Sequence, residues 1–175
     1  MKTTSDDKVL SFNFNEEVDR FFDDRSLTNG AVPDAVILMG GVAAGKTSIR
    51  RQNYSHGYVL IDAAEIFISL SQGEYLPFPG PIEEPLNLVG HFVVKRAFEE
   101  RRNIVTEVIG GVLEKLEELV TALNGAGYKV HVAMVNCSMD AAMERNANRS
   151  KDNISAYYAE SFHHAWILEA CKNSL

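Results

Sequence analysis

Short runs of apolar residues recur along the chain, and each run stops at a glycine or a polar residue. Four such runs cover residues 35–39, 58–61, 103–109 and 129–135. The first run is too short for a confident helix and is followed by glycines, so it is typical of a strand covered on both faces. The other three runs are strand candidates, so the pattern predicts four strands.

Segments with helical spacing of apolar residues separate these strands. Before the first strand, Val18, Phe21 and Phe22 predict a short amphipathic helix that ends by Asn29-Gly30. The other predicted helices cover residues 46–52, 63–70, 86–102, 112–124, 138–150 and 154–172. Strands that alternate with helices predict an α/β fold with three αβα layers around a mostly parallel sheet of about four to five strands. We expect residues 1–30 to be an acidic helical extension and residues 31–175 to be a single domain.

A proline-rich segment interrupts this alternation. Four of the five prolines lie in residues 77–85, between the third and fourth predicted helices. Because proline lacks an N–H and clashes with the preceding turn, we expect neither helix nor central strand here. The segment is long enough to be a functional loop.

Composition narrows the classes of partner. The 175 residues include 17 Lys and Arg against 24 Asp and Glu, which gives a formal net charge of −7. An acidic surface repels the phosphate backbone, so we expect no general nucleic-acid binding. Without an apolar segment of membrane or signal-peptide length, the sequence predicts a cytoplasmic protein with no membrane contact. Cys137 and Cys171 have no CxxC or histidine spacing that would suit a metal.

The most specific motif follows the first strand and matches G-x-x-x-x-G-K-[ST], the phosphate loop of P-loop NTPases. Its glycines allow the backbone N–H groups to surround phosphate oxygens, and the next helix directs its positive end at them. We expect Lys46 to reach the β- and γ-phosphates and the Thr47 hydroxyl to bind Mg²⁺. The predicted nucleotide-binding residues are Gly40, Gly41, Val42, Ala43, Ala44, Gly45, Lys46, Thr47 and Ser48.

Three carboxylates are candidates for the chemistry that such a loop serves. Asp62 ends the second strand and Glu107 lies late in the third, so both belong to the edge of the sheet where ligands bind. A carboxylate in an apolar strand favours function, and we expect Glu107 to bind metal or substrate. Asp62 fits a helix N-cap and a catalytic base equally well. Glu65, one helical turn later, fits a solvated helix position better than a catalytic one.

Two arginines after the fourth strand could complete a phosphate site. Arg145 and Arg149 are four residues apart and share one helix face, although two solvated arginines would show the same spacing. In P-loop kinases, arginines on a mobile element close over the phosphates and exclude water.

The motifs, taken in order, resemble the zeta toxin family of P-loop kinases, which phosphorylate a hydroxyl of UDP-N-acetylglucosamine. The resemblance covers about residues 35–150. Its stretches are GGVAAGKT (40–47), YVLIDAAEIF (58–67), RNIVTEVIGG (102–111) and GYKVHVAMV (127–135), followed by Glu144-Arg145. The resemblance implies that Lys46 and Thr47 bind ATP-Mg²⁺, that Glu107 contacts substrate or assists the metal, and that Arg145 holds the phosphates. It also makes a protein antitoxin or regulatory protein a candidate partner.

One departure from the family keeps other functions open. The family's catalytic base is usually an Asp two residues after the end of the second strand, where this chain has Ala64. In a small-molecule kinase, Asp62 or Glu65 would then accept the proton of the hydroxyl acceptor, and residues 77–85 with Gly110-Gly111 would line the acceptor site. Alternatives are an antibiotic kinase similar to chloramphenicol phosphotransferase, and a nucleotide-binding regulatory module without efficient transfer.

Overall fold

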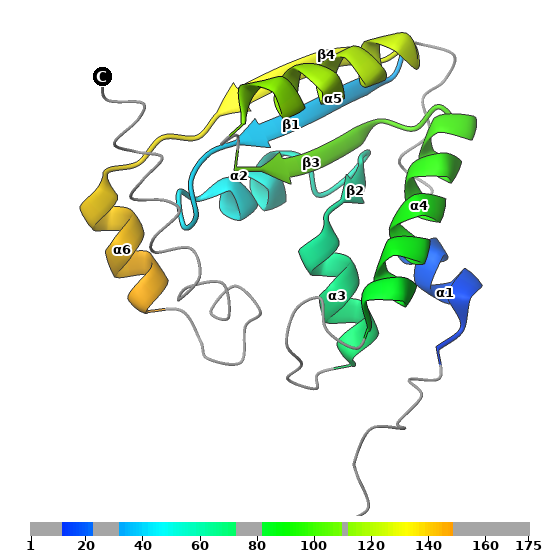
Figure 1. Cartoon of the computed structure of the whole chain (residues 1–175), viewed down its shortest axis with the longest axis horizontal. Helices are drawn as coiled ribbons and strands as arrows, with labels where there is room; N and C mark the ends of the chain where they lie inside the picture. The colour runs from blue at the N-terminus through cyan, green and yellow to red at the C-terminus, as the bar shows by residue number, and fades with distance from the viewer. Residues whose placement is uncertain (1–11, 23–31, 73–81, 110–111, 149–175) are drawn as a thin grey trace, which may run out of the picture.

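The computed structural model describes residues 12–22, 32–72, 82–109 and 112–148, and helices and strands alternate along them (Figure 1). The four predicted strands are confirmed to within one residue at each end, whereas the helix predicted over residues 154–172 lies outside the described residues. The elements are α1 (Phe14–Asp19), β1 (Asp34–Met39), α2 (Lys46–Asn53), β2 (Val59–Ile61), α3 (Ala63–Ser71), α4 (Glu83–Glu99), β3 (Ile104–Val108), α5 (Leu113–Gly125), β4 (Lys129–Met134) and α6 (Met139–Ala147).

The described strands form one parallel sheet in the order β2-β3-β1-β4. Each crossover between parallel strands carries at least one helix, as the geometry of such sheets requires. In the register of β1 and β3, Leu38 lies opposite Glu107, which brings that carboxylate to the carboxyl end of the sheet. The parallel sheet with helices on both faces confirms the predicted three-layer α/β fold.

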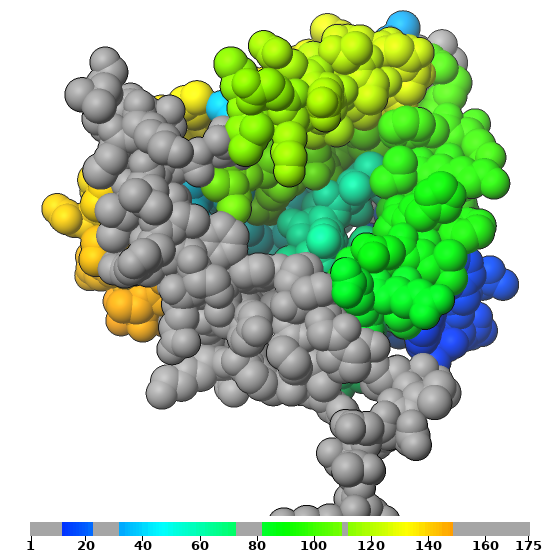
Figure 2. Space-filling model, viewed as in Figure 1, coloured from blue at the N-terminus to red at the C-terminus, as the bar shows by residue number. Residues whose placement is uncertain are grey.

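The two faces of the sheet bury very different amounts of apolar surface. Ala35 and Ile37 of β1 face a large cluster that includes residues of α3, α4 and α5. The alternate β1 residues, Val36 and Leu38, belong to a smaller cluster with Val105 of β3 and Ile49 of α2. Figure 1 shows α5 lying across β1 and β4, and Figure 2 shows α5 and α4 forming much of the described surface on this side. The larger core therefore lies on the face opposite α2.

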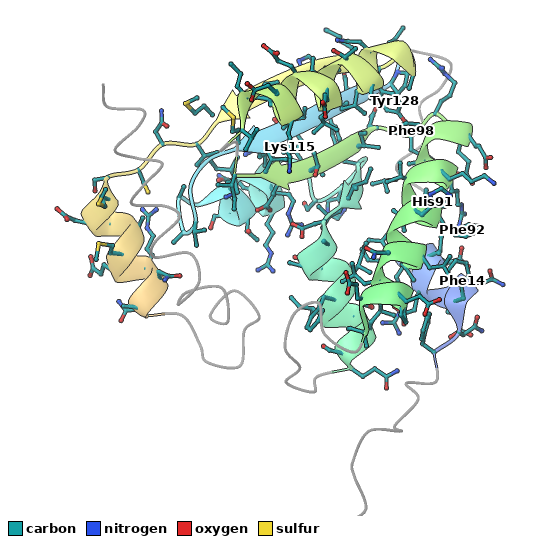
Figure 3. The ribbon with its side chains drawn as sticks, viewed as in Figure 1. Phe14, His91, Phe92, Phe98, Lys115 and Tyr128 are labelled. Carbon is teal, nitrogen blue, oxygen red and sulfur yellow. The ribbon has the colours of Figure 1, made fainter. Side chains whose placement is uncertain are left out.

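Helix α1 is joined to the domain by specific contacts with α3 and α4. The Ser69 hydroxyl of α3 donates to the buried carboxylate of Glu17 at 2.6 Å. Phe14 packs edge-on against Phe92 of α4, with ring centroids 4.9 Å apart, where Figure 3 shows both side chains. These contacts attach α1 to the same apolar core that covers the sheet.

The prediction for the proline segment is wrong at its end. Helix α4 begins at Glu83 and contains Pro85 in its first turn. Proline is tolerated there because the first N–H groups of a helix have no partner within the helix. Residues 77–81 and Gly110-Gly111 lie outside the described residues. Among the helices that the structure describes, none combines the length and apolar character that crossing a bilayer requires.

Candidate functional site

The loop between β1 and α2 has the backbone that its glycines predict. A Cβ on Gly40 would lie 2.4 Å from the carbonyl oxygen of Val135, so the close approach of these two backbone segments requires glycine. Gly45 has a φ of 108°, which glycine adopts without strain. Ala43 has a φ of 59°, and this left-handed conformation costs an alanine about 1–2 kcal/mol. The loop therefore holds a strained curve at the residues where phosphate is expected.

Lys46 lies across this loop. Its ammonium group donates to the carbonyl oxygens of Gly40 at 2.7 Å and Gly41 at 2.9 Å. Helix α2 begins at Lys46, and no side chain caps its N-terminus. Its first N–H groups and the helix dipole therefore face the concave side of the loop, an arrangement that suits phosphate oxygens.

Thr47 and Glu107 meet beside the loop. The Thr47 hydroxyl donates to Oε2 of Glu107 at 3.0 Å, which joins α2 to the end of β3. Two adjacent ligands of an octahedral Mg²⁺, each at about 2.1 Å, would lie about 3.0 Å apart, so these oxygens fit the ion. In the described part of the chain, no cluster of three or more acidic, histidine or cysteine side chains suits a metal. A bound Mg²⁺ would therefore also need nucleotide oxygens and water.

Arg50 organises the carboxylates of the site. Its Nε donates to Oε1 of Glu107 and its NH2 group donates to Oε1 of Glu65, both at 2.7 Å. The side chains of Arg50 and Glu107 are each 9% exposed, whereas that of Glu65 is 30% exposed. The prediction that Glu65 is a solvated helix residue is therefore wrong, because a nearly buried arginine binds it. Arg50 was not among the predicted site residues, although its position one helical turn after Lys46 was an available signal.

Asp62 lies near the other two carboxylates but is bound differently. Its Oδ1 accepts the backbone N–H of Ala64 at 2.7 Å, so the N-cap that the sequence allowed is present. Burial raises the pKa of Asp62 above its ordinary value, and the charges of Glu107 and Glu65 raise it further, although N–H groups of Ala64 and Glu65 oppose the shift. A carboxyl group with a raised pKa is suited to accepting a proton.

Arg145 lies on the other side of the loop. Its NH1 group donates to the carbonyl oxygens of Ala44 at 3.2 Å and Ala43 at 3.4 Å. Helix α6, which carries it, begins beside the loop with Ser138 accepting the N–H of Ala141. Arg149 lies outside the described residues, so the structure does not place the second predicted arginine.

The structure therefore gathers most of the predicted site residues at one end of the sheet. Lys46, Thr47 and Ser48 begin α2, Glu107 ends β3, and Arg145 reaches the loop from α6. Val42 lies within the loop itself, between Gly41 and Ala43.

Comparison with known families supports the resemblance drawn from the motifs. The family model described as "Zeta toxin" matches residues 83–165, slightly less than half of the chain. The matched residues include β3 with Glu107 and α6 with Arg145, whereas the phosphate loop precedes them. The predicted likeness to the zeta toxin family is thereby confirmed. A comparison with curated protein sequences gave no match.

Several solved structures share the fold at low sequence identity. A protein of the PezAT chromosomal toxin–antitoxin system of Streptococcus pneumoniae aligns with a TM-score of 0.50 and 18% identity, over 69% of this chain and 53% of that one. A chain of the Pnkp1/Rnl/Hen1 RNA repair complex gives a TM-score of 0.54 and 15% identity, over 78% of this chain and 46% of that one.

A chain of the AvrRxo1-ORF1:ORF2 complex with ATP gives a TM-score of 0.53 and 13% identity, over 80% of this chain and 46% of that one. This chain therefore spans about half the length of the solved structures described here. At such identities the likeness concerns the fold.

Proposed function

We propose that this zeta toxin-like chain is an ATP- and Mg²⁺-dependent kinase that transfers the γ-phosphoryl group to a hydroxyl of a small molecule. One observation carries the proposal: the Thr47 hydroxyl and the Glu107 carboxylate lie 3.0 Å apart beside a phosphate loop that Lys46 crosses. A glycine-rich turn with an incidental lysine would not need a strand carboxylate aimed at its threonine. Bound Mg²⁺ would neutralise charge on the β- and γ-phosphates.

The three carboxylates divide between two tasks. Arg50 binds both Glu65 and Glu107 at 2.7 Å, so these two carboxylates are engaged in ion pairs. Within the described part of the chain no cation pairs with Asp62, and burial raises its pKa. We therefore assign proton acceptance to Asp62, which takes the role that the family's Asp would have at Ala64.

The transfer step then needs few participants. The acceptor oxygen forms a bond to the γ-phosphorus, and its proton passes to the Asp62 carboxylate. The bond between the γ-phosphorus and the β–γ bridging oxygen breaks, and ADP leaves with the electron pair. Lys46 and Arg145 would stabilise the charge on the transferred group, since both lie against the loop.

The zeta toxin likeness supports UDP-N-acetylglucosamine as the first acceptor to test. The PezAT structure belongs to a toxin–antitoxin system, which supports a neutralising protein as a partner of this chain. A structure with ATP in a related fold supports ATP as the nucleotide.

A direct assay tests the proposal. Incubation with γ-labelled Mg-ATP and UDP-N-acetylglucosamine should move label into the sugar nucleotide, and mass spectrometry of a treated metabolite extract should find the acceptor if it differs. Lys46→Ala should lower transfer by about 10²–10³-fold. Lys115→Ala, which changes an exposed lysine on α5, is the matched control and should keep full transfer. Tight ATP binding without transfer to any metabolite would contradict the kinase proposal.

Asp62→Asn tests the assignment of the base. Asparagine keeps an N-cap oxygen but accepts no proton, so transfer should fall by about 10²–10⁴-fold while ATP binding persists. Glu65→Gln should have a smaller effect on transfer. If Glu65→Gln is the more damaging variant, Asp62 is not the base.

The absence of a carboxylate at Ala64 supports a second candidate, a regulatory module that binds nucleotide without efficient transfer. That module would bind a partner protein equally well in wild type and in Asp62→Asn. A kinase would show the loss of transfer described above.

A further inference from the structure

Arg50 is a nearly buried charge of the site, and its contacts are with carboxylates of other elements. Arg50 is 8% exposed as a whole residue, and one edge of its guanidinium contacts two carboxylates on different elements. Removing an unneeded ion pair of this kind from a protein interior is often neutral or stabilising. A contribution to folding stability therefore does not explain why Arg50 occupies this position.

The geometry around Glu107 shows what Arg50 adds. One oxygen of Glu107 accepts from Arg50, and the other accepts from Thr47. With Oε1 held, the carboxylate plane is fixed, and Oε2 stays directed at Thr47 and the loop. A carboxylate without the first contact could turn about its last torsion, which is broad for this side chain.

Arg50 is itself held in place. Its second contact, with Glu65, anchors the guanidinium to α3, so the direction of Glu107 depends on α2, α3 and β3 together. Lys46 and Thr47 precede Arg50 by one turn of the same helix, so one rigid element carries both phosphate-binding groups and the residue that aims the carboxylate.

We propose that Arg50 is a positioning residue that aims Glu107 at Thr47 and so presets the two protein ligands of the nucleotide's Mg²⁺. The inference rests on the proposed function, because it assumes that Thr47 and Glu107 bind the metal of Mg-ATP. It predicts a defect confined to the metal-dependent part of nucleotide binding. A merely structural role would weaken nucleotide binding with and without the metal.

The test compares ATP affinity in Mg²⁺ with ATP affinity in EDTA, measured by calorimetry on the full chain. Arg50→Lys keeps the charge but loses the planar fork that serves two carboxylates. The gain in affinity that Mg²⁺ provides should fall by about 10–100-fold in Arg50→Lys, and affinity in EDTA should stay close to wild type. Arg51→Lys, the same change at the next residue, is the matched control. The Arg51 side chain is 71% exposed and lies 3.9 Å from Oε1 of Glu65, a loose contact that lysine can keep, so this variant should behave as wild type.

A second variant keeps the test decisive if Arg50→Lys does not fold. Glu65→Gln removes one anchor of Arg50 but leaves Thr47 and Glu107 intact, and it should lower the Mg²⁺ gain by a smaller factor. An unchanged Mg²⁺ gain in folded Arg50→Lys, or an equal loss in Mg²⁺ and in EDTA, would overturn the inference. If the ATP affinity of the wild-type chain is the same in Mg²⁺ and in EDTA, the metal part of the proposed function is overturned instead.

Discussion

Arg50 and Arg96 make the same contact in two regions of the molecule. Each guanidinium joins two carboxylates from different elements: Arg50 binds Glu107 and Glu65, and Arg96 binds Asp19 of α1 and Glu100 at the end of α4. Their surroundings differ, since the side chain of Arg50 is 9% exposed and that of Arg96 is 35% exposed.

The two arginines differ in whether water can take the place of a lost ion-pair partner. Near the surface, water and salt compensate a broken pair, and such pairs contribute about 0–1 kcal/mol. In a nearly dry site a carboxylate that loses its cation has no substitute, so breaking one partner is costly even where the intact pair adds little. Losing the arginine should therefore cost little stability beside α1 and much more stability beside the phosphate loop.

The largest expected effect on stability comes from Arg50→Met. It leaves the nearly buried carboxylate of Glu107 without a cation, and the free energy of unfolding should fall by about 3–5 kcal/mol. Urea unfolding followed by circular dichroism measures the change. Adding Glu107→Gln and Glu65→Gln to Arg50→Met should restore much of the loss, because the unpaired charges are then gone. A loss below about 1 kcal/mol, the range of surface pairs, would mean that water reaches Glu107.

The next effect concerns Asp62, the carboxylate of the site that no arginine binds. Because its pKa is raised in the folded protein, the folded state holds the proton more tightly than the unfolded state. That contribution is complete below the unfolded pKa of about 4 and is lost as pH rises through the folded pKa.

Asp62→Asn, which keeps the N-cap and never ionises, should therefore be more stable than wild type at neutral pH. Urea titrations from pH 4 to 8 should show this advantage shrinking as pH falls. An advantage that grows toward acid would reverse the sign of the pKa shift.

A smaller effect is expected at the surface pair. Arg96→Met keeps most of the aliphatic stem but loses the contacts with Asp19 and Glu100 and the guanidinium, which lies 4.2 Å from the centre of the Phe22 ring. The free energy of unfolding should fall by about 0.5–1 kcal/mol, measured by the same urea experiment. A loss as large as that of Arg50→Met would show that burial does not separate the two arginines.

Salt should give the smallest effect and sharpen the contrast. At 1 M NaCl the screening length is about 3 Å, so the difference between Arg96→Met and wild type should nearly vanish. The difference for Arg50→Met should shrink much less, because salt screens a nearly buried pair less than an exposed one. Each variant is compared with wild type at the same salt concentration.

Much of the fold followed from local patterns. A strand covered on both faces is a continuous apolar run, so β1 was predicted to within one residue. The error at Pro85 also has a local cause, since proline is excluded from helix interiors but not from a first turn. The strand order β2-β3-β1-β4 depends on contacts between distant segments, which periodicity does not report.

The site divides in the same way. The loop motif predicted Lys46 and Thr47, because it fixes their positions in the sequence relative to Gly40 and Gly45. Arg50 was missed and Glu65 was misread because their meeting depends on how α2 and α3 approach each other across the sheet edge. Only a three-dimensional arrangement distinguishes an arginine that is solvated from one that binds two carboxylates.

The position of β1 in the sheet also has a consequence for synthesis on the ribosome. Val36 lies opposite Val105 on one side and His131 on the other, so β1 has no strand partner until distant parts of the chain have emerged. Parallel pairing of this kind forms slowly, since the long connection must close first. Gly40 likewise gains its contact with Val135 only at that stage. The phosphate loop, although encoded in the first third of the chain, becomes able to bind nucleotide only after most of the protein has been made.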